Sequence, residues 1–285
     1  MALVTLKYVL ENARKNKYAV GSFNFFGLEN LRGIVKAASE NKSPVIAMAS
    51  TGAVKVMGEK VVVVAAEKLS EEYGVDIVLH LDHCKDDLEM LKRCVDNGFT
   101  SVMIDASAYD YEENVRQTRL AVEYASRTGC SVEGEIGHIG GVEDEIVVSE
   151  CEALFTVPED AARFVADTGV DALAVAVGTV HGFYKLPPKL DFDRIKKIHE
   201  LTPVPLVLHG GTGVPDDDFR KAIPLGVLKI NVGTELKVNG YFNVMKDFTP
   251  QVKNSDPRKV ALKIVDKCSE IVTEKINVFG SADRL

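Results

Sequence analysis

The sequence has 285 residues, of which 46% are hydrophobic, and no Pro/Gly/Ser-rich linker divides it, so the chain can bury a large core in one domain. Its 34 basic and 42 acidic residues give a net charge of -8 without a basic stripe, which argues against a nucleic-acid partner. No apolar stretch approaches the roughly 20 residues of a membrane helix, and no signal-like segment opens the chain. We therefore expect a cytoplasmic protein without a membrane partner.

Short β-rich runs alternate with segments of helical spacing along the chain. This alternation predicts βαβ units and a parallel sheet, and eight strands in roughly 250 residues favour a closed (β/α)8 barrel, the TIM barrel of the α/β class. An open doubly wound sheet is the alternative, but the first strand-to-helix turn, residues 24–28, lacks the GxGxxG of a dinucleotide site. The predicted strands are residues 18–23, 44–48, 76–81, 101–104, 131–134, 172–177, 206–208 and 227–230, and the predicted helices between them include 28–41, 59–73, 88–97, 113–128, 158–168 and 192–201.

The segment after the eighth predicted strand has helical character. We predict that residues 1–285 form a single barrel domain, with residues 238–285 as a C-terminal helical extension that contains a turn at Pro257. The five cysteines are odd in number and include no CxxC pair, so we expect reduced packing residues rather than disulfides or a thiolate zinc site.

Polar side chains lie at the carboxyl ends of all the predicted strands. In a TIM barrel these ends meet around the active site, whereas a chance distribution would place many polar residues on helices or at the opposite strand ends. The convergence therefore predicts one site built from many strands. In chain order its candidate residues are Asn24, Ser50, Asp82 with His83, Asp105, Glu135, His181, His209 and Asn231.

Three of these residues are histidines, in the contexts HLDH, GTVHG and VLHGGTG. A lone histidine is more often structural, but three at corresponding strand ends predict a shared metal. Zinc held by three histidines keeps a fourth position open for water or substrate, which is typical of catalytic sites; cobalt or a similar ion would also suit these nitrogens. The predicted ligands are His83, His181 and His209.

Three carboxylates accompany the histidines. Asp105 and Glu135 are candidates for a second divalent metal position or for hydrogen bonds to the ligating histidines, although Asp105 could instead cap a helix or face solvent. Asp82 directly precedes a predicted ligand, so it is expected near the metal, where it could exchange a proton with a substrate oxygen.

Glycine-rich turns follow the last two strands. Loops after strands seven and eight of a TIM barrel, together with a helix N-terminus, often bind phosphate through backbone amides. The earlier loop GHIGGVEDE, residues 137–145, could close over a substrate and bring in a base, but its acidic end could equally be a solvated charge run. The role of His138 in that loop is left open. The predicted phosphate-binding residues are Gly210, Gly211, Thr212, Asn231, Val232, Gly233 and Thr234.

Taken together, HLDH, SVMIDAS, the VEGEIG to GGVED segment, GTVHGFY, LVLHGGTGV and KINVGTELK resemble the class II, metal-dependent ketose-bisphosphate aldolases, particularly the tagatose- and fructose-bisphosphate branch. The resemblance extends to the final INVFGSADRL and thus over essentially the whole chain. It implies reversible retro-aldol cleavage of a ketose 1,6-bisphosphate to dihydroxyacetone phosphate and glyceraldehyde 3-phosphate, with zinc stabilising the enediolate. It also implies a place in carbohydrate metabolism such as glycolysis, and a homodimer or homotetramer.

The resemblance also implies roles for individual residues. Asp82 matches the acidic residue that exchanges a proton at the C4 oxygen, and Glu143 matches a mobile-loop base that acts on the dihydroxyacetone phosphate carbon. Arg258 falls where related enzymes supply, from a neighbouring subunit, an arginine that contacts the distal phosphate of the substrate. The other implied positions are His83, His181 and His209 for zinc, Asp105 and Glu135 for a second or displaced metal, Gly182, Gly210 to Thr212 and Asn231 to Thr234 for dihydroxyacetone phosphate, backbone carbonyls for a monovalent cation (Na+ or K+), and Asn24 and Ser50 for ancillary substrate contacts.

Two motifs depart from the pattern of many family members, because SVEGEIG replaces SVEAELG and LHGGTG replaces LHGAS. These departures leave the aldehyde partner open, including another ketose phosphate or a deoxy-keto-gluconate phosphate. A Schiff-base mechanism is not favoured, since Lys229 is the only candidate interior-strand lysine. This lysine is expected to balance a nearby charge or to help bind phosphate. A metal-dependent sugar-phosphate epimerase or isomerase on the same barrel and a non-catalytic sugar-phosphate binding protein are the competing functions.

Overall fold

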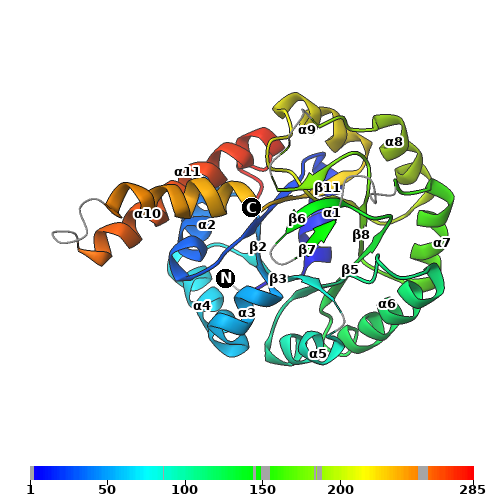
Figure 1. The fold of residues 1–285 in the computed structure, drawn as a ribbon, viewed down its shortest axis with the longest axis horizontal. Helices are drawn as coiled ribbons and strands as arrows, with labels where there is room; N and C mark the ends of the chain where they lie inside the picture. The colour runs from blue at the N-terminus through cyan, green and yellow to red at the C-terminus, as the bar shows by residue number, and fades with distance from the viewer. Residues whose placement is uncertain are drawn as a thin grey trace.

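The computed structural model describes residues 3–85, 87–143, 146–148, 155–182, 184, 188–249 and 256–285. Eight parallel strands close into a barrel in the order β1-β11-β10-β8-β5-β4-β3-β2, with helices around it, which confirms the predicted TIM barrel (Figure 1). The barrel strands are β1 (Val20–Asn24), β2 (Val45–Ser50), β3 (Ile77–Cys84), β4 (Ser101–Ile104), β5 (Ser131–Ile136), β8 (Ala172–Val175), β10 (Leu206–Leu208) and β11 (Val227–Val232).

A second, three-stranded sheet forms outside the barrel, in the order β7-β6-β9, and was not predicted. Its strands are β6 (Gly140–Glu143), β7 (Ile146–Val148) and β9 (Val180–His181). β6 and β9 pair in parallel, with Gly141 opposite His181, so the loop after β5 is joined by backbone pairing to the segment after β8.

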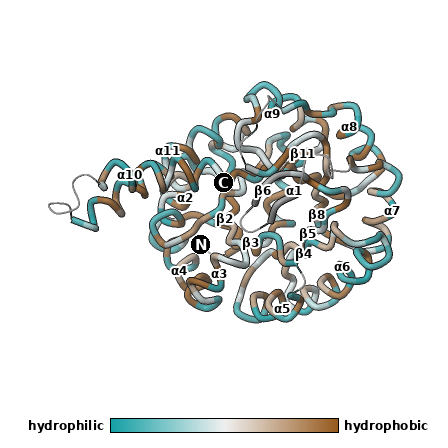
Figure 2. The backbone as a smooth tube through the Cα atoms, viewed as in Figure 1, coloured by the Kyte–Doolittle hydropathy of each residue, from teal (hydrophilic) through white to brown (hydrophobic). Residues whose placement is uncertain are grey.

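The two faces of each barrel strand contact different partners. On β3, Ile77, Leu79 and Leu81 pack with the surrounding helices, whereas Val78 belongs to the cluster inside the barrel. Strand side chains alternate, so His80 and Asp82 also point inward, successively nearer the carboxyl end. In Figure 2, hydrophilic positions lie mainly along the outer sides of the helices that surround the barrel.

The first helix, α1 (Leu6–Asn16), packs across the amino end of the barrel. Its buried residues Leu6, Val9 and Leu10 join the apolar cluster inside the strands. Thr5 begins the helix by accepting a hydrogen bond at its side chain from the amide of Tyr8, at 3.3 Å. The carboxyl end is thus the polar end of the barrel.

The expected C-terminal helices are present, and the last of them, α11 (Pro257–Phe279), packs between α2 and α9 and so completes the ring. Gly33 permits this packing, because a Cβ at that position would approach the Val265 carbonyl oxygen at 2.7 Å. The outer part of α11 projects from the barrel together with η2 and α10, forming an arm (Figure 1). The remaining helices are α2 (Leu28–Glu40), α3 (Thr51–Met57), α4 (Glu59–Tyr73), α5 (Leu88–Asn97), α6 (Tyr111–Ala125), α7 (Pro158–Thr168), α8 (Phe192–Leu201), α9 (Asp216–Ala222), η1 (Ile223–Leu225), η2 (Leu236–Phe242) and α10 (Asn243–Phe248).

None of the helices in the described ranges combines the length and apolar character that a membrane span needs.

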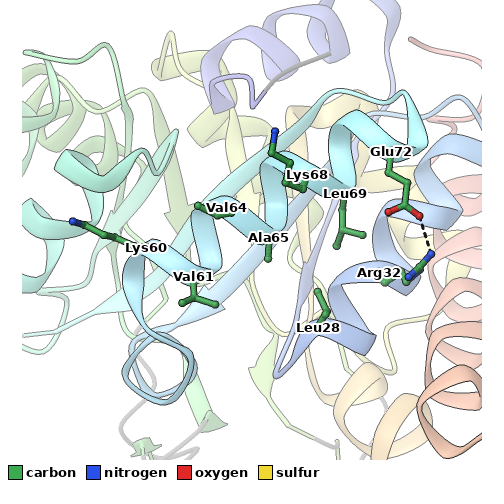
Figure 3. Close-up of a pocket in the computed structure, with 9 residues that line it drawn as sticks. All are labelled: Leu28, Arg32, Lys60, Val61, Val64, Ala65, Lys68, Leu69 and Glu72. Carbon is green, nitrogen blue, oxygen red and sulfur yellow. Dashed lines mark hydrogen bonds and ion pairs between the residues drawn. The ribbon is translucent and has the colours of Figure 1, made fainter. Parts of the chain in front are cut away.

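A groove of about 510 Å³ lies on the outer surface between α2 and α4, where Arg32 and Glu72 form an ion pair at 2.8 Å (Figure 3). Its lining residues all belong to these two helices, so this groove is separate from the polar barrel mouth. They are Leu28, Arg32, Lys60, Val61, Val64, Ala65, Lys68, Leu69 and Glu72.

Candidate active site at the carboxyl ends of the strands

His83 is turned toward the site by an irregularity in β3. The sequence predicted that the strand ends at Leu81, but it continues to Cys84, with a register shift against β4 between those residues. Regular alternation would direct Asp82 and His83 to opposite faces. His83 instead adopts φ +43°, a conformation that non-glycine residues rarely occupy and that persists where surrounding structure enforces it. The bulge allows both side chains to face the barrel mouth.

The three predicted histidine ligands converge. His209 follows β10 directly, as expected, but His181 does not end the sixth barrel strand: it lies in β9, six residues beyond the end of β8. Nδ1 of His209 is 2.9 Å from Nε2 of His83 and 3.4 Å from Nε2 of His181. Tetrahedral zinc with bonds of about 2.1 Å would hold its nitrogens about 3.4 Å apart, so the spacing fits a metal after small adjustments.

Two carboxylates determine which ring nitrogens face the centre. Asp105 Oδ2 is 2.9 Å from His83 Nδ1, and Glu133 Oε1 is 2.9 Å from His209 Nε2. Each carboxylate accepts a ring proton, which leaves lone pairs on His83 Nε2 and His209 Nδ1. Two such acceptors 2.9 Å apart repel unless a cation or proton lies between them. Burial lowers the pKa of His209 to about 4, so this ring is neutral at neutral pH. This donor set suits a divalent metal.

A second group of side chains that could hold a metal shares His83 with the first. Oxygen atoms of Asp105 and Glu135 and a ring nitrogen of His83 lie within 4.8 Å of one another. Although burial opposes it, the hydrogen bond from His83 and the Lys85 ammonium, 3.1 Å away, hold the pKa of Asp105 well below its usual range. Burial and the Asp105 charge raise the pKa of Glu135 to about 8. The pKa values of the two carboxyls are therefore shifted in opposite directions.

Asp82, Asn24 and Ser50 lie on neighbouring strands beside the histidines. Asp82 is 1% exposed and accepts a hydrogen bond at Oδ2 from Asn24 Nδ2, at 3.1 Å. Ser50 ends β2 and also caps α3, since its Oγ accepts from the Ala53 amide. Gly233 lies so close to Asn24 that a Cβ there would collide with the Asn24 Oδ1.

The predicted phosphate loops lie together at the mouth. The Gly211 amide donates to the Asn231 carbonyl at 2.9 Å, and Thr212 Oγ1 accepts from the Glu235 amide at 3.2 Å, just before η2 begins. Tyr184, which is not among the predicted site residues, donates its hydroxyl proton to the Gly210 carbonyl at 2.7 Å and accepts from the Val180 amide at 3.2 Å. It joins the loop after β10 to the strand that contains His181.

Replacing Gly210 with alanine is expected to weaken metal binding and to destabilise the fold. Gly210 has φ +67°, and a Cβ there would collide with the Val180 carbonyl, next to His181. Gly74→Ala is the matched control, because Gly74 has φ +65° with nothing within 4 Å of its Cβ. Both variants should lose about 1–3 kcal/mol of stability from backbone strain. Only Gly210→Ala should lower metal affinity, measured by chelator competition; equal affinities would show that the contact does not position His181.

The remaining predicted site residues, Gly182, Glu143 and Arg258, do not lie at the ends of barrel strands. Gly182 follows β9 with φ +93°. Glu143 is the last residue of β6, but its side chain lies outside the described part of the structure. Arg258 is exposed in the first turn of α11, at the outer end of the arm, and its guanidinium pairs with Asp256 at 2.7 Å. The chain therefore does not bring Arg258 to its own barrel mouth.

A buried ion pair below the histidines was not predicted as part of the site. Glu133 on β5 and Lys229 on β11 are both fully buried, and their Oε2 and Nζ atoms are 2.8 Å apart. Glu133 precedes Glu135 by two residues and Lys229 precedes Asn231 by two, so each shares the inward face of its strand with a predicted site residue. This period of two was the signal that could have identified them.

Comparisons with known proteins agree with this architecture. The family model for class II fructose-bisphosphate aldolases matches residues 4–284. The chain belongs to the class II fructose-bisphosphate aldolase family. The YdjI aldolase from Escherichia coli K12 is 34% identical with a TM-score of 0.87, and the match covers 99% of each chain. A Coccidioides immitis protein provisionally named a fructose-1,6-bisphosphate aldolase is 32% identical with a TM-score of 0.90, over 98% of this chain and 97% of that one.

The class II aldolase fold extends to more distant proteins. The fructose-bisphosphate aldolase of Campylobacter jejuni shares 22% identity and a TM-score of 0.85, over 100% of this chain and 97% of that one, which shows the common fold. Membership in the class II aldolase family indicates a lyase with aldolase activity. Members of this family generally use a divalent metal, and His83, His181 and His209 form a site that fits one.

Proposed function

We propose that this class II aldolase uses zinc to cleave a ketose 1,6-bisphosphate, fructose or tagatose 1,6-bisphosphate, reversibly between C3 and C4. The products would be dihydroxyacetone phosphate and glyceraldehyde 3-phosphate. The observation that supports this proposal most directly is the convergence of three histidine nitrogens beside Asp82 and two glycine-rich loops. Histidine nitrogens are suitable zinc ligands, and a three-histidine site leaves a coordination position for substrate.

The metal would supply Lewis-acid stabilisation of the negative charge that develops on the substrate as the carbon–carbon bond breaks. Asp82 would take the proton from the C4 hydroxyl during cleavage and return it during condensation, with Asn24 holding the carboxylate through its 3.1 Å hydrogen bond. Glu143 would exchange the proton on the dihydroxyacetone phosphate carbon. Its strand supports this role, because β6 pairs with the β9 segment that contains His181.

The phosphate of dihydroxyacetone phosphate would bind between the loops after β10 and β11. Backbone amides of glycine-rich turns approach an anion closely, and the contact between Thr212 and the Glu235 amide holds the two loops together. Asp105 and Glu135 would accommodate a second or displaced divalent ion, and nearby backbone carbonyls a monovalent cation. The proposed phosphate contacts are Gly182, Gly210, Gly211, Thr212, Asn231, Val232, Gly233 and Thr234, with Ser50 as an ancillary contact.

A product-detected panel tests the proposal. Zinc-loaded protein is incubated with fructose 1,6-bisphosphate, tagatose 1,6-bisphosphate, other ketose phosphates and a deoxy-keto-gluconate phosphate, and triose phosphate release is followed with a coupling enzyme. We expect release from one of the two bisphosphates. Interconversion of sugar phosphates without any triose phosphate would instead identify an epimerase or isomerase. Binding without turnover of any compound would identify a binding protein.

We propose further that the protein acts as a homodimer or homotetramer in which the arm of one subunit reaches the site of another. Phe242, Met245 and Leu262 on the arm are 55%, 42% and 63% exposed, which supports its burial against a partner. Replacing Arg258 with alanine should raise KM for a bisphosphate by about tenfold or more, through loss of a charged hydrogen bond, with little change for a substrate that lacks the distal phosphate. Lys259→Ala on the same turn is the control. A protein that is monomeric by light scattering and still cleaves substrate would refute the proposed oligomer with its shared site.

A further inference from the structure

We infer that the buried Lys229–Glu133 ion pair positions His209 as a metal ligand, so that both residues act on the metal through this histidine. The inference rests on the proposed metal centre. The two oxygens of Glu133 have separate partners: Oε1 is 2.9 Å from His209 Nε2, and Oε2 is 2.8 Å from Lys229 Nζ. The carboxylate therefore joins a lysine on β11 to the histidine after β10.

The geometry determines what Glu133 does to His209. A carboxylate at Nε2 keeps the ring proton there and leaves Nδ1 as the lone pair that faces His83 and His181. A histidine that donates its other ring proton to a carboxylate is held in one orientation and becomes a more basic ligand. A neutral acceptor would orient the ring without this gain. The charge on Glu133 is thus the feature that strengthens the metal site.

Lys229 allows that charge to exist in the barrel interior. Both side chains are 0% exposed, and an isolated carboxylate at this depth would be strongly destabilising. The nearby His80 does not supply the countercharge: its Nε2 is 3.9 Å from Glu133 Oε2, its Nδ1 contacts Ser101 Oγ at 2.7 Å, and burial lowers its pKa well below its usual range. Lys229 is therefore the cation that balances Glu133, rather than a phosphate ligand or a Schiff-base lysine.

Removing both charges separates a purely structural ion pair from one that acts on the metal, because loss of a purely structural pair would leave metal affinity unchanged. Buried ion pairs can often be replaced by neutral side chains of similar volume without loss of stability, whereas removing one partner leaves a buried charge unpaired. The double variant Glu133→Gln/Lys229→Met removes both charges and retains an amide that can still accept from His209. It separates an effect on the metal from an effect on folding.

Zinc affinity, measured by competition with a chelator, is the main readout, together with urea unfolding of the metal-free protein and the visible spectrum of the cobalt form. We expect the double variant to unfold near the wild-type midpoint and to bind zinc about 10- to 100-fold more weakly, as for loss of other carboxylate partners of metal-bound histidines. The control is Arg32→Met/Glu72→Gln, which removes the exposed ion pair between α2 and α4 and should leave zinc affinity unchanged.

A second variant covers the case in which the double variant does not fold. Glu133→Asp keeps the charge, and the flexible Lys229 side chain can follow it, but the shorter side chain withdraws from His209. It too should weaken zinc binding. Wild-type affinity in either folded variant would overturn the inference. A wild-type protein that binds zinc tightly at the three histidines but releases no triose phosphate would refute the proposed function alone, and one that binds no metal there would refute both.

Discussion

Removal of the metal is expected to abolish carbon–carbon bond cleavage, and added zinc is expected to restore it. The proposed reaction depends on Lewis-acid stabilisation worth several kcal/mol, so the rate should fall by about a thousandfold or more in the presence of a strong chelator. The His209→Ala variant should show the same loss without any chelator, because it removes Nδ1 from the centre of the three histidines. His199→Gln on α8 is the control. Triose phosphate release and metal content should be measured on the same samples.

Borohydride tests the alternative mechanism, in which the substrate forms a Schiff base with a lysine. Reduction in the presence of substrate should leave the protein mass unchanged, since the interior lysine, Lys229, is fully buried against Glu133. Chelator-resistant cleavage, together with a substrate adduct on a lysine, would contradict the zinc mechanism. The family membership would stand, but the assignment of the three histidines would be wrong.

Replacing Asp82 is expected to produce the second large effect, a loss of turnover with normal zinc content. Loss of a positioned general acid–base typically costs about 10²- to 10⁴-fold in rate. Asp82→Asn keeps the size of the side chain, and Asp82→Ala removes it. Both should lower kcat much more than they change zinc affinity, as measured by steady-state kinetics and metal analysis.

Zinc loss in both Asp82 variants would show that this carboxylate is a ligand rather than a proton carrier. Asn24→Ala offers a graded comparison, because it removes only the hydrogen bond to Asp82 Oδ2. It should lower kcat less than the Asp82 variants do, and an equal or larger effect would indicate that Asn24 has a direct role in the reaction.

The barrel was predictable because its strands and helices follow local patterns. Short β-rich runs and helical spacing locate elements such as β4 and α4, whose bounds match the prediction. The convergence of the three predicted metal ligands was predictable in part, because His83 and His209 lie at the carboxyl ends of barrel strands, whereas His181 reaches the site from β9. The bulge that turns His83 inward was not predictable from the sequence. The positive φ of His83 is enforced by the surrounding structure rather than by a local glycine or proline.

Contacts between distant residues were harder to predict. β9 is two residues long and forms by pairing with a loop about 40 residues earlier, so no local pattern marks His181 as part of a second sheet. Glu133 and Lys229 lie within strands, whereas the predicted site residues lie mainly at strand ends. Their partnership depends on closure of the barrel, which brings together strands about 95 residues apart in the sequence.

The pairing of β6 with β9 links the position of Glu143, the proposed loop base, to the position of His181, a proposed metal ligand. Gly141 lies opposite His181, and Glu143 follows on the same strand. If β6 shifts when substrate enters, its pairing with β9 would carry that displacement to His181, one of the proposed metal ligands. The coordination geometry would then report loop position, so that a cobalt-substituted enzyme would signal closure as a change of colour before any bond in the substrate is broken.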